Sequence, residues 1–379
     1  MNANMNILIT GDLYIADQFK ESQLIDPSVQ AFFKRSDLNI VNLEAPVTDS
    51  ASRILKTGPN MKASKESTAK VLAALEVDVA TLANNHILDY GAQGVMDTIT
   101  FLSERDIQTV GAGGNLTEAA KTLFLETKAG KIALVNFAEN EWASATSDTA
   151  GANPMDVIDN AKQIQAAKQA ADFVFVIVHG GHEYYNLPSP RMQKQYRFYA
   201  DQGADIVIGH HTHCIGGYET HHCVPIYYSL GNFLFTEHSN DEDWYIGLIL
   251  EVNIDNGKIA TRLHPVRQQI DDFMVKLLEG KDKTDILQRI DSINTIIGDA
   301  TELEKEWKNY ASEKSDAYLR YWSPLSFIKN RYIRAALFKL GLRFTNKTGL
   351  ALFLNLMRCE AHRDLSKEAL RTYLYRLSD

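Results

Sequence analysis

The sequence predicts an α/β protein with a largely parallel inner sheet region. Over the first two-thirds of the 379 residues, short apolar runs alternate with segments whose apolar residues recur at helical spacing. Such alternation is typical of crossover connections between parallel strands. Two antiparallel hairpins should interrupt this alternation, one over 122–137 with its turn at Ala129-Gly130, the other over 246–263 with its turn at Asp255-Asn256-Gly257.

The predicted strands are short apolar runs that end at a glycine or a polar residue, as buried strands do. In chain order these strands are Asn6–Thr10, Leu38–Leu43, Asp78–Ala83, Asp172–Val178 and Asp205–Ile208. The predicted helices between them include Ser64–Leu75, Gly91–Glu104, Met155–Ala171 and Arg191–Gln202. The loops that follow parallel strands meet at one edge of a sheet, which is where such folds bind ligands.

Length and composition indicate an ordinary soluble globular chain, 45% hydrophobic and 23% charged. We expect a main domain over residues 1–269 and a helical, basic region over 270–379. Three cysteines are too few for a disulfide framework. The polar start at Met1–Met5 lacks the features of a signal peptide, and no stretch reaches the roughly 20 apolar residues of a spanning helix. These observations predict a cytoplasmic location.

The net charge of −9 is unevenly distributed. Residues 321–379 contain 11 Lys and Arg against four Asp and Glu, so residues 1–320 carry a net charge of −16. An acidic body argues against nucleic-acid partners. Helical patterns extend over 269–297 and 302–319, and residues 320–359 interleave basic with aromatic and aliphatic side chains. This basic region either packs on the acidic body or makes peripheral contact with the inner membrane surface.

Polar residues that bind metals follow five of the predicted strands. They are Asp12, Glu44, Asn85 with His86, His179, and the pair His211 and His213. Residues two apart in an extended segment point to the same side, so both rings of the pair can be directed at one place. Carboxylate, amide and imidazole groups together suit divalent metals. The pattern therefore predicts a metal centre at the strand ends.

Six ordered segments resemble the CapA (poly-γ-glutamate capsule biosynthesis) branch of the calcineurin-like metallophosphoesterases. They begin with Gly11-Asp12 and extend over roughly residues 6–250. The other five are Val41-Asn42-Leu43-Glu44-Ala45-Pro46-Val47-Thr48, Ala83-Asn84-Asn85-His86-Ile87-Leu88-Asp89-Tyr90-Gly91, His179-Gly180-Gly181-His182-Glu183-Tyr184, Ile208-Gly209-His210-His211-Thr212-His213 and Tyr228-Ser229-Leu230-Gly231-Asn232-Phe233.

The resemblance implies a four-layer αββα metallophosphoesterase-like sandwich with an α-helical C-terminal appendage. It implies one or two divalent ions, of Mn, Fe or Zn. By position, Asp12 and His213 would serve one ion, Asn85, His179 and His211 the other, and Glu44 would bridge. His86 matches the histidine that contacts the scissile group. His210, Glu183 and Asn232 are further candidates for orienting a ligand or contacting substrate.

Two departures from the wider superfamily bear on function. Tyr14 stands where Asp-x-His would supply a ligand, and Glu44 replaces an aspartate, which leaves the number of metals open. The resemblance implies a metal-dependent hydrolase that cleaves a phosphoester or amide through a metal-activated water, in capsule or cell-surface polymer metabolism. Its substrate would be an anionic small molecule or polymer. The alternative is a non-catalytic assembly or binding factor for synthesis or export of an anionic polymer.

Overall fold

The computed structural model describes residues 4–19, 23–342 and 346–376. The chain divides into two compact units, Met1–Glu304 and Lys305–Asp379. The first unit contains the sheets and every candidate site residue. The second consists of helices.

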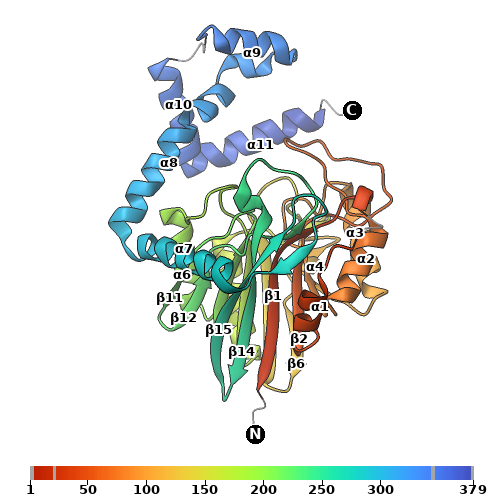
Figure 1. Cartoon of the computed structure of the whole chain (residues 1–379). Coiled ribbons are helices and arrows are strands. Elements are labelled where there is room, and N and C mark those ends of the chain that lie inside the picture. The colour runs from red at the N-terminus through yellow and green to blue at the C-terminus, as the bar shows by residue number, and fades with distance from the viewer. Residues whose placement is uncertain (1–3, 20–22, 343–345, 377–379) are drawn as a thin grey trace. The chain divides into compact units, whose positions relative to one another are not determined.

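Two large sheets form the centre of the first unit (Figure 1). The first sheet has the order β16-β15-β14-β1-β2-β3-β4, with β13 also paired to β1; its strands are β1 (Met5–Tyr14), β2 (Leu38–Leu43), β3 (Val79–Thr81), β4 (Gln108–Val110), β13 (Asn232–Phe235), β14 (Ile246–Asp255), β15 (Lys258–Gln268) and β16 (Val275–Leu277). The second has the order β11-β12-β10-β9-β7-β6; its strands are β6 (Leu123–Thr127), β7 (Gly130–Ala138), β9 (Phe173–His179), β10 (Ile206–His210), β11 (Tyr218–His221) and β12 (Val224–Tyr227). A small pair joins β5 (Ala112–Gly113) to β8 (Gly151–Ala152).

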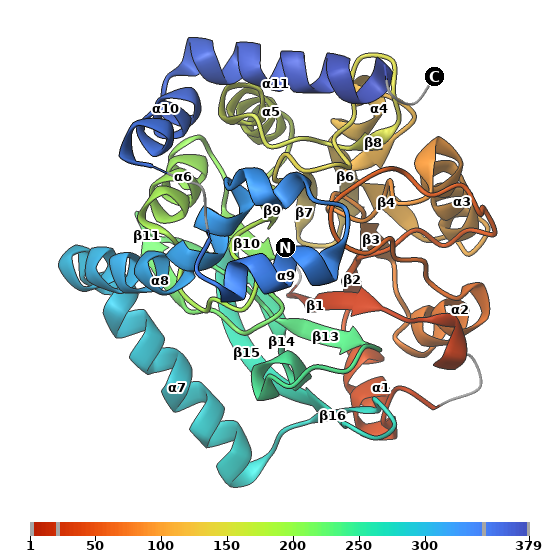
Figure 2. The same ribbon diagram turned by 90° about the horizontal axis from the view of Figure 1, so that it is seen from above.

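Helices cover the outer face of each sheet, which makes four layers, αββα (Figure 2). The first sheet packs against α1 (Pro27–Phe33), α2 (Lys65–Ala74) and α3 (Gly91–Ser103), and the second against α5 (Val157–Ala170), α6 (Pro190–Asp201) and α7 (Gly280–Gly298). Shorter elements are α4 (Leu116–Ala119) and the 3₁₀ turns Asp17–Phe19 and Glu242–Tyr245. This is the layered architecture that the family resemblance implied.

Alternating side chains of β1 explain how the sheets pack. Ile7 and Ile9 point into the core between the two sheets, whereas Leu8 belongs to the core under the helices. Successive side chains of a strand point to opposite faces, and here both faces are covered. Both faces of the strand must therefore be apolar, which produces the continuous hydrophobic runs in the sequence.

Both predicted hairpins are present, as the antiparallel pairs β6–β7 and β14–β15. The first turns at Lys128-Ala129, one residue earlier than predicted, because Thr127 pairs with Gly130. Two other predictions were wrong. The first strand does not end at Thr10 but continues to Tyr14, because β13 pairs with Asp12–Tyr14 in parallel. The helix predicted from residue 269 starts only at Gly280, because Val275–Leu277 instead pairs with β15 as an edge strand.

Helix α7 belongs with the first unit, because Ile286, Ile290, Ile293 and Ile297 are buried in its cores. The division between compact units therefore falls after α7, and the predicted domain boundary at 269/270 stays a prediction. The remaining helices are α8 (Ala300–Tyr321), α9 (Arg331–Lys339), α10 (Lys347–Arg358) and α11 (Glu360–Arg376), with a 3₁₀ turn at Pro324–Phe327. Of the helices within the described ranges, none is both long and apolar enough to cross a bilayer.

Candidate metal centre

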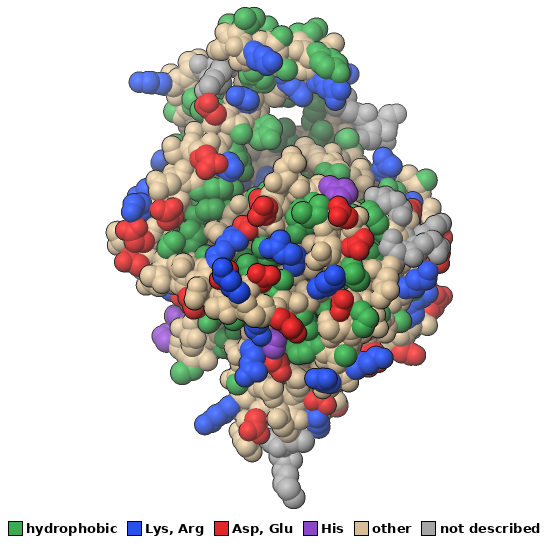
Figure 3. Space-filling model, viewed as in Figure 1, with side chains coloured by type: hydrophobic (Ala, Val, Ile, Leu, Met, Phe, Trp, Pro, Cys, Tyr) green, Lys and Arg blue, Asp and Glu red, His purple; other side chains and the backbone are tan. Residues whose placement is uncertain are grey.

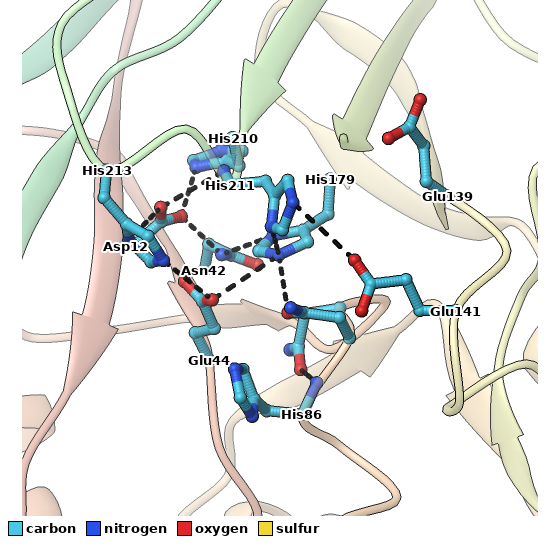
Figure 4. Close-up of polar contacts among 12 residues, drawn as sticks. Asp12, Asn42, Glu44, His86, Glu139, Glu141, His179, His210, His211 and His213 are labelled. Carbon is cyan, nitrogen blue, oxygen red and sulfur yellow. Dashed lines mark hydrogen bonds and ion pairs between the residues drawn. The ribbon is translucent and has the colours of Figure 1, made fainter. Parts of the chain in front are cut away.

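The six predicted metal-site residues lie together at the carboxyl ends of the parallel strands. Figure 4 labels five of them, and the sixth, Asn85, lies against His179. Strands β1, β2, β3, β9 and β10 all end at this edge, because they are parallel within their sheets and the two sheets face each other. Asp12 lies within β1, and His179 is the last residue of β9. The other four, Glu44, Asn85, His211 and His213, follow their strands directly or in the next loop. All six residues are buried.

Ligand atoms form two groups that share Glu44. One group contains Glu44, His179 and His211, and the other contains Asp12, Glu44 and His213; within each, the atoms lie no more than 4.8 Å apart. Oε1 of Glu44 is 3.5 Å from Nε2 of His179 and 3.6 Å from Nε2 of His213. A carboxylate placed between two sets of ligands is suited to bridging two ions.

Two potential ligand atoms lie beside Nε2 of His179. The amide oxygen Oδ1 of Asn85 is 3.1 Å away, and Nδ1 of His211 is also 3.1 Å away. Two imidazole nitrogens and an amide oxygen can share a single proton or surround a cation. Asn85, His179 and His211 are the residues that the resemblance assigns to one metal, and the structure brings them together.

The electrostatics of the centre fit a divalent cation. Both carboxylate oxygens of Glu44 are buried and have no hydrogen-bond partner. Burial and the charge of Asp12 raise the pKa of Glu44 well above its ordinary value. Burial and the charge of His211 lower the pKa of His179, and burial together with His213 lowers the pKa of His211 to about 3. Neutral imidazoles around unpaired carboxylate oxygens are the donors that Mn, Fe and Zn ions bind in proteins.

The backbone after β10 turns sharply to present its histidines. His211 and His213 have φ angles of 93° and 56°, in the region that side chains rarely adopt. Oδ2 of Asp12 accepts a hydrogen bond of 3.2 Å from the backbone N–H of His211. Just before this turn, Gly209 permits the close approach of the Tyr228 backbone, since a Cβ there would come within 2.2 Å of the carbonyl oxygen of Tyr228. Strain of this kind is concentrated at functional sites.

Two of the three further candidates hold residues of the centre in place. Nδ1 of His210 is 3.0 Å from Oδ1 of Asp12, which helps to hold the pKa of Asp12 below its ordinary range although burial by itself would raise it. Oδ1 of Asn232 is 2.9 Å from Nδ1 of His213, and its amide donates to the carbonyl oxygen of Trp244. Glu183 is exposed, and its charge contributes to the raised pKa of Glu44.

Asn42 is a residue of the centre that the sequence analysis did not single out. Its Nδ2 donates a hydrogen bond of 2.7 Å to Oδ1 of Asp12 and lies 3.3 Å from Nδ1 of His179. Its Oδ1 accepts from the hydroxyl of Thr81. Asn42 lies on an apolar strand two positions before Glu44, so the two side chains point to the same face. A polar residue at that position was the signal in the sequence that could have identified it.

Glu141 also lies at the centre without having been predicted. Its Oε1 is 3.8 Å from Nε2 of His211, and burial together with the charge of Glu183 raises its pKa. Glu141 follows β7 in a loop that contains several polar residues, so its position in the sequence does not distinguish it.

His86 contacts a buried ion pair formed by Asp89 and Lys56. Nδ1 of His86 is 2.7 Å from Oδ2 of Asp89, and the other oxygen of Asp89 accepts a 2.6 Å hydrogen bond from Nζ of Lys56. The Lys56 side chain is only 3% exposed and its Nζ is also 3.3 Å from Nδ1 of His86. Asp89 therefore fixes the orientation of the His86 ring through Nδ1, which leaves Nε2 as the nitrogen available to contact a substrate.

Tyr14 is buried, with its ring centroid 5.0 Å from that of Phe235. Burial and the charge of Glu237 raise the pKa of its phenol. At the position where the family resemblance would place a histidine ligand, the chain therefore has a neutral phenol and not an anionic ligand.

Comparison with known proteins identifies relatives of this chain. The family model described as "Bacterial capsule synthesis protein PGA_cap" matches residues 6–237. The chain is 33% identical over 257 residues to the "Capsule biosynthesis protein CapA" of Bacillus anthracis, covering 64% of this chain and 61% of that protein. It is 36% identical over 220 residues to the "PGA biosynthesis protein CapA" of Bacillus subtilis (strain 168), covering 57% and 56%. The match thus extends over less than two-thirds of either relative.

Solved structures resemble the chain more distantly. A hypothetical protein from Thermus thermophilus has a TM-score of 0.44 and 16% identity, covering 73% of this chain and 100% of that one. A putative 5'-nucleotidase from Staphylococcus aureus, in complex with alpha-ketoglutarate, has a TM-score of 0.43 and 13% identity, covering 76% and 58%.

Proposed function

Because the chain belongs to the bacterial capsule synthesis protein family PGA_cap, we propose that it is a metal-dependent hydrolase of capsule or cell-surface polymer metabolism. It would cleave a phosphoester or an amide of an anionic polymer or its precursor. The observation that carries the proposal is Glu44, whose two buried oxygens lack partners between two groups of ligand atoms. An unpaired buried carboxylate is costly unless a cation accompanies it.

Two divalent ions would be held by residues already in contact. Asp12 and His213 would hold one ion. Asn85, His179 and His211 would hold the other, and Glu44 would contact both. When bound, such ions supply Lewis-acid activation of water and of the bond to be cleaved. Asp12 and Glu44 bring fewer negative charges than two divalent ions bring positive ones, so a loaded centre favours an anionic substrate.

The chain's own residues would orient the reaction. His86 is fixed through Nδ1 by Asp89, so its Nε2 can exchange a proton with the substrate or stabilise charge on it. His210 and Asn42 hold Asp12, and Asn232 holds His213. Partners of this kind set ring orientation and ligand basicity at metal sites. Glu141 and Glu183 are negative groups near the centre and would disfavour an anion placed against them.

The test is hydrolysis by the purified chain after loading with Mn²⁺, Fe²⁺ or Zn²⁺. A panel of phosphoesters and a panel of γ-glutamyl amides would separate the two bond types. We expect His86→Ala to lower turnover by about 10²–10⁴-fold while metal content stays unchanged. His238→Ala, which changes a histidine packed on Phe273, is the matched control. A wild-type chain that binds no divalent metal would refute the proposal.

A second candidate function is a non-catalytic factor for assembly or export of an anionic polymer. Tyr14 favours it, because a neutral phenol stands where the wider superfamily has a histidine ligand. A relative from Mycobacterium tuberculosis (strain ATCC 25618 / H37Rv), 30% identical over 210 residues, is described as a "Probable polyglutamine synthesis accessory protein". Function retained in cells after replacement of both Asn85 and His86 would favour this candidate, and its loss would favour chemistry.

A further inference from the structure

Exposed apolar side chains are concentrated in the helical second unit. Of the 23 large hydrophobic side chains that are exposed among the described residues, 15 belong to Lys305–Asp379, which is about a fifth of the chain. Exposed apolar surface of this density marks a site of interaction with a protein or a membrane. The first unit has only eight such side chains, which come from separate segments between Leu55 and Ile270.

The same unit has a net positive charge, although the chain as a whole is acidic. It contains 15 Lys and Arg against seven Asp and Glu, and between Arg320 and Cys359 it contains eight basic and no acidic residues. Figure 3 shows hydrophobic and basic side chains next to one another on the surface of this unit. The occupant of this surface must therefore accept apolar groups and positive charge together.

Helix α10 combines both properties in one amphipathic element. At about 100° per residue, its side chains separate into two sectors. The apolar sector contains Leu350, Leu352, Phe353, Leu354, Leu356 and Met357, and the polar sector contains Lys347, Thr348, Asn355 and Arg358. Leu352 and Leu354 are each 58% exposed, and Phe353 and Met357 are exposed as well. The helix thus presents an apolar face bordered by a basic side chain in its first turn and another in its last.

We propose that α10, with the basic residues around it, binds the surface of an anionic lipid membrane. An amphipathic helix with Lys and Arg on its polar face lies in the interface and buries its apolar face among the acyl chains. Lys347 and Arg358 can keep their charges at the headgroups while their aliphatic stems lie lower. At 12 residues the helix is far too short to span the bilayer, so it would lie on the surface.

Charge distinguishes a membrane from a second copy of the chain as the occupant of this surface. A second copy of this unit would bring a second set of unbalanced positive charges to the same face. An anionic bilayer satisfies the apolar sector and the basic residues at once. This inference does not depend on the metal centre or on the proposed hydrolysis.

Flotation of the full chain with lipid vesicles tests the inference. We expect binding to vesicles of phosphatidylcholine with about 30% phosphatidylglycerol, little binding to phosphatidylcholine alone, and release as the salt concentration rises. The double variant Leu352→Gln/Phe353→Gln should bind more than about tenfold more weakly. Its matched control is Val157→Gln/Ile158→Gln, which changes an exposed apolar pair of the first unit and should bind as the wild type does.

The charge contribution is tested separately. Lys347→Gln/Arg358→Gln should weaken binding to the anionic vesicles about fivefold for each side chain removed. Lys121→Gln/Lys281→Gln removes two exposed lysines of the first unit and serves as the control. Equal binding to neutral and anionic vesicles, or no binding to either, would overturn the inference. So would a dimer in sedimentation that the α10 apolar variant dissociates, because the face would then join two copies of the chain.

Discussion

Nδ2 of Asn42 donates a 2.7 Å hydrogen bond to Oδ1 of Asp12 and lies 3.3 Å from Nδ1 of His179. One amide therefore positions a carboxylate of the first group of ligand atoms and an imidazole of the second. Partners of this kind fix the orientation of metal ligands and tune their basicity. The contact between Asn42 and His179 connects the two sheets, because Asn42 lies in β2 and His179 in β9.

Replacement of Asn42 by alanine should weaken metal binding by about 10–100-fold, because Asp12 and His179 lose their common partner. Isothermal titration with Mn²⁺ measures the change. Asn39→Ala is the matched control, since Asn39 is buried on the same strand and bonds the backbone carbonyl oxygen of Glu76. It should lower stability without changing metal affinity. Equal affinities for the two variants would show that Asn42 has no role in the centre.

Glu44→Gln should stabilise the metal-free chain by about 1–3 kcal/mol at neutral pH, because it removes a buried carboxylate whose oxygens have no hydrogen-bond partner. The folded-state pKa of Glu44 lies above its ordinary value of 4.5, so protonation favours the folded state. The wild type should therefore lose stability relative to the variant as pH rises from about 4.5 through the raised pKa.

Urea unfolding in the presence of a chelator, at several pH values, measures this difference. The difference between wild type and variant isolates the contribution of the Glu44 carboxyl, including its interaction with His179 and His213. The control is Glu251→Gln, because Glu251 already has a partner, Nε2 of His264 at 2.7 Å. This control should not stabilise the chain. A Glu44→Gln variant less stable than the wild type under chelation would contradict the prediction.

Lys56→Met should destabilise the fold by about 3–5 kcal/mol, because it leaves the fully buried carboxylate of Asp89 without its cation. The double variant Lys56→Met/Asp89→Asn should recover much of the loss. Lys65→Met is the contrasting surface case: Lys65 pairs with Asp49, whose side chain is 85% exposed, and the change should cost less than about 1 kcal/mol. Chemical denaturation measures all three, and equal effects of the two lysine replacements would argue against the buried pair.

His211→Ala and His213→Ala should each remove one of two bound divalent ions, since they belong to different groups that share Glu44. Metal content is measured after loading and desalting. The measurement needs a His222→Ala background, because Asp201, His221 and His222 form an exposed third group of ligand-type atoms. A wild type holding one ion, lost in His211→Ala and kept in His213→Ala, would place a single metal beside His179.

The sequence by itself determined the alternation of strands and helices and the segments that end at the centre. Asp12, Glu44, Asn85, His179, His211 and His213 were identifiable because metal-binding residue types follow successive apolar strands. Both hairpins were predictable from their turn residues. These are local properties, since apolar period and turn chemistry depend on near neighbours in the chain.

Only the tertiary structure decided which side chains support those six. Asn42, Glu141 and the Lys56–Asp89 pair act across distances of 30 residues or more in the chain, and nothing in their local sequence identifies their partners. The continuation of β1 to Tyr14 likewise depends on β13, more than 200 residues later. Pairing between remote strands and the burial of charges are properties of the folded chain, because each depends on what the neighbouring elements bring into contact.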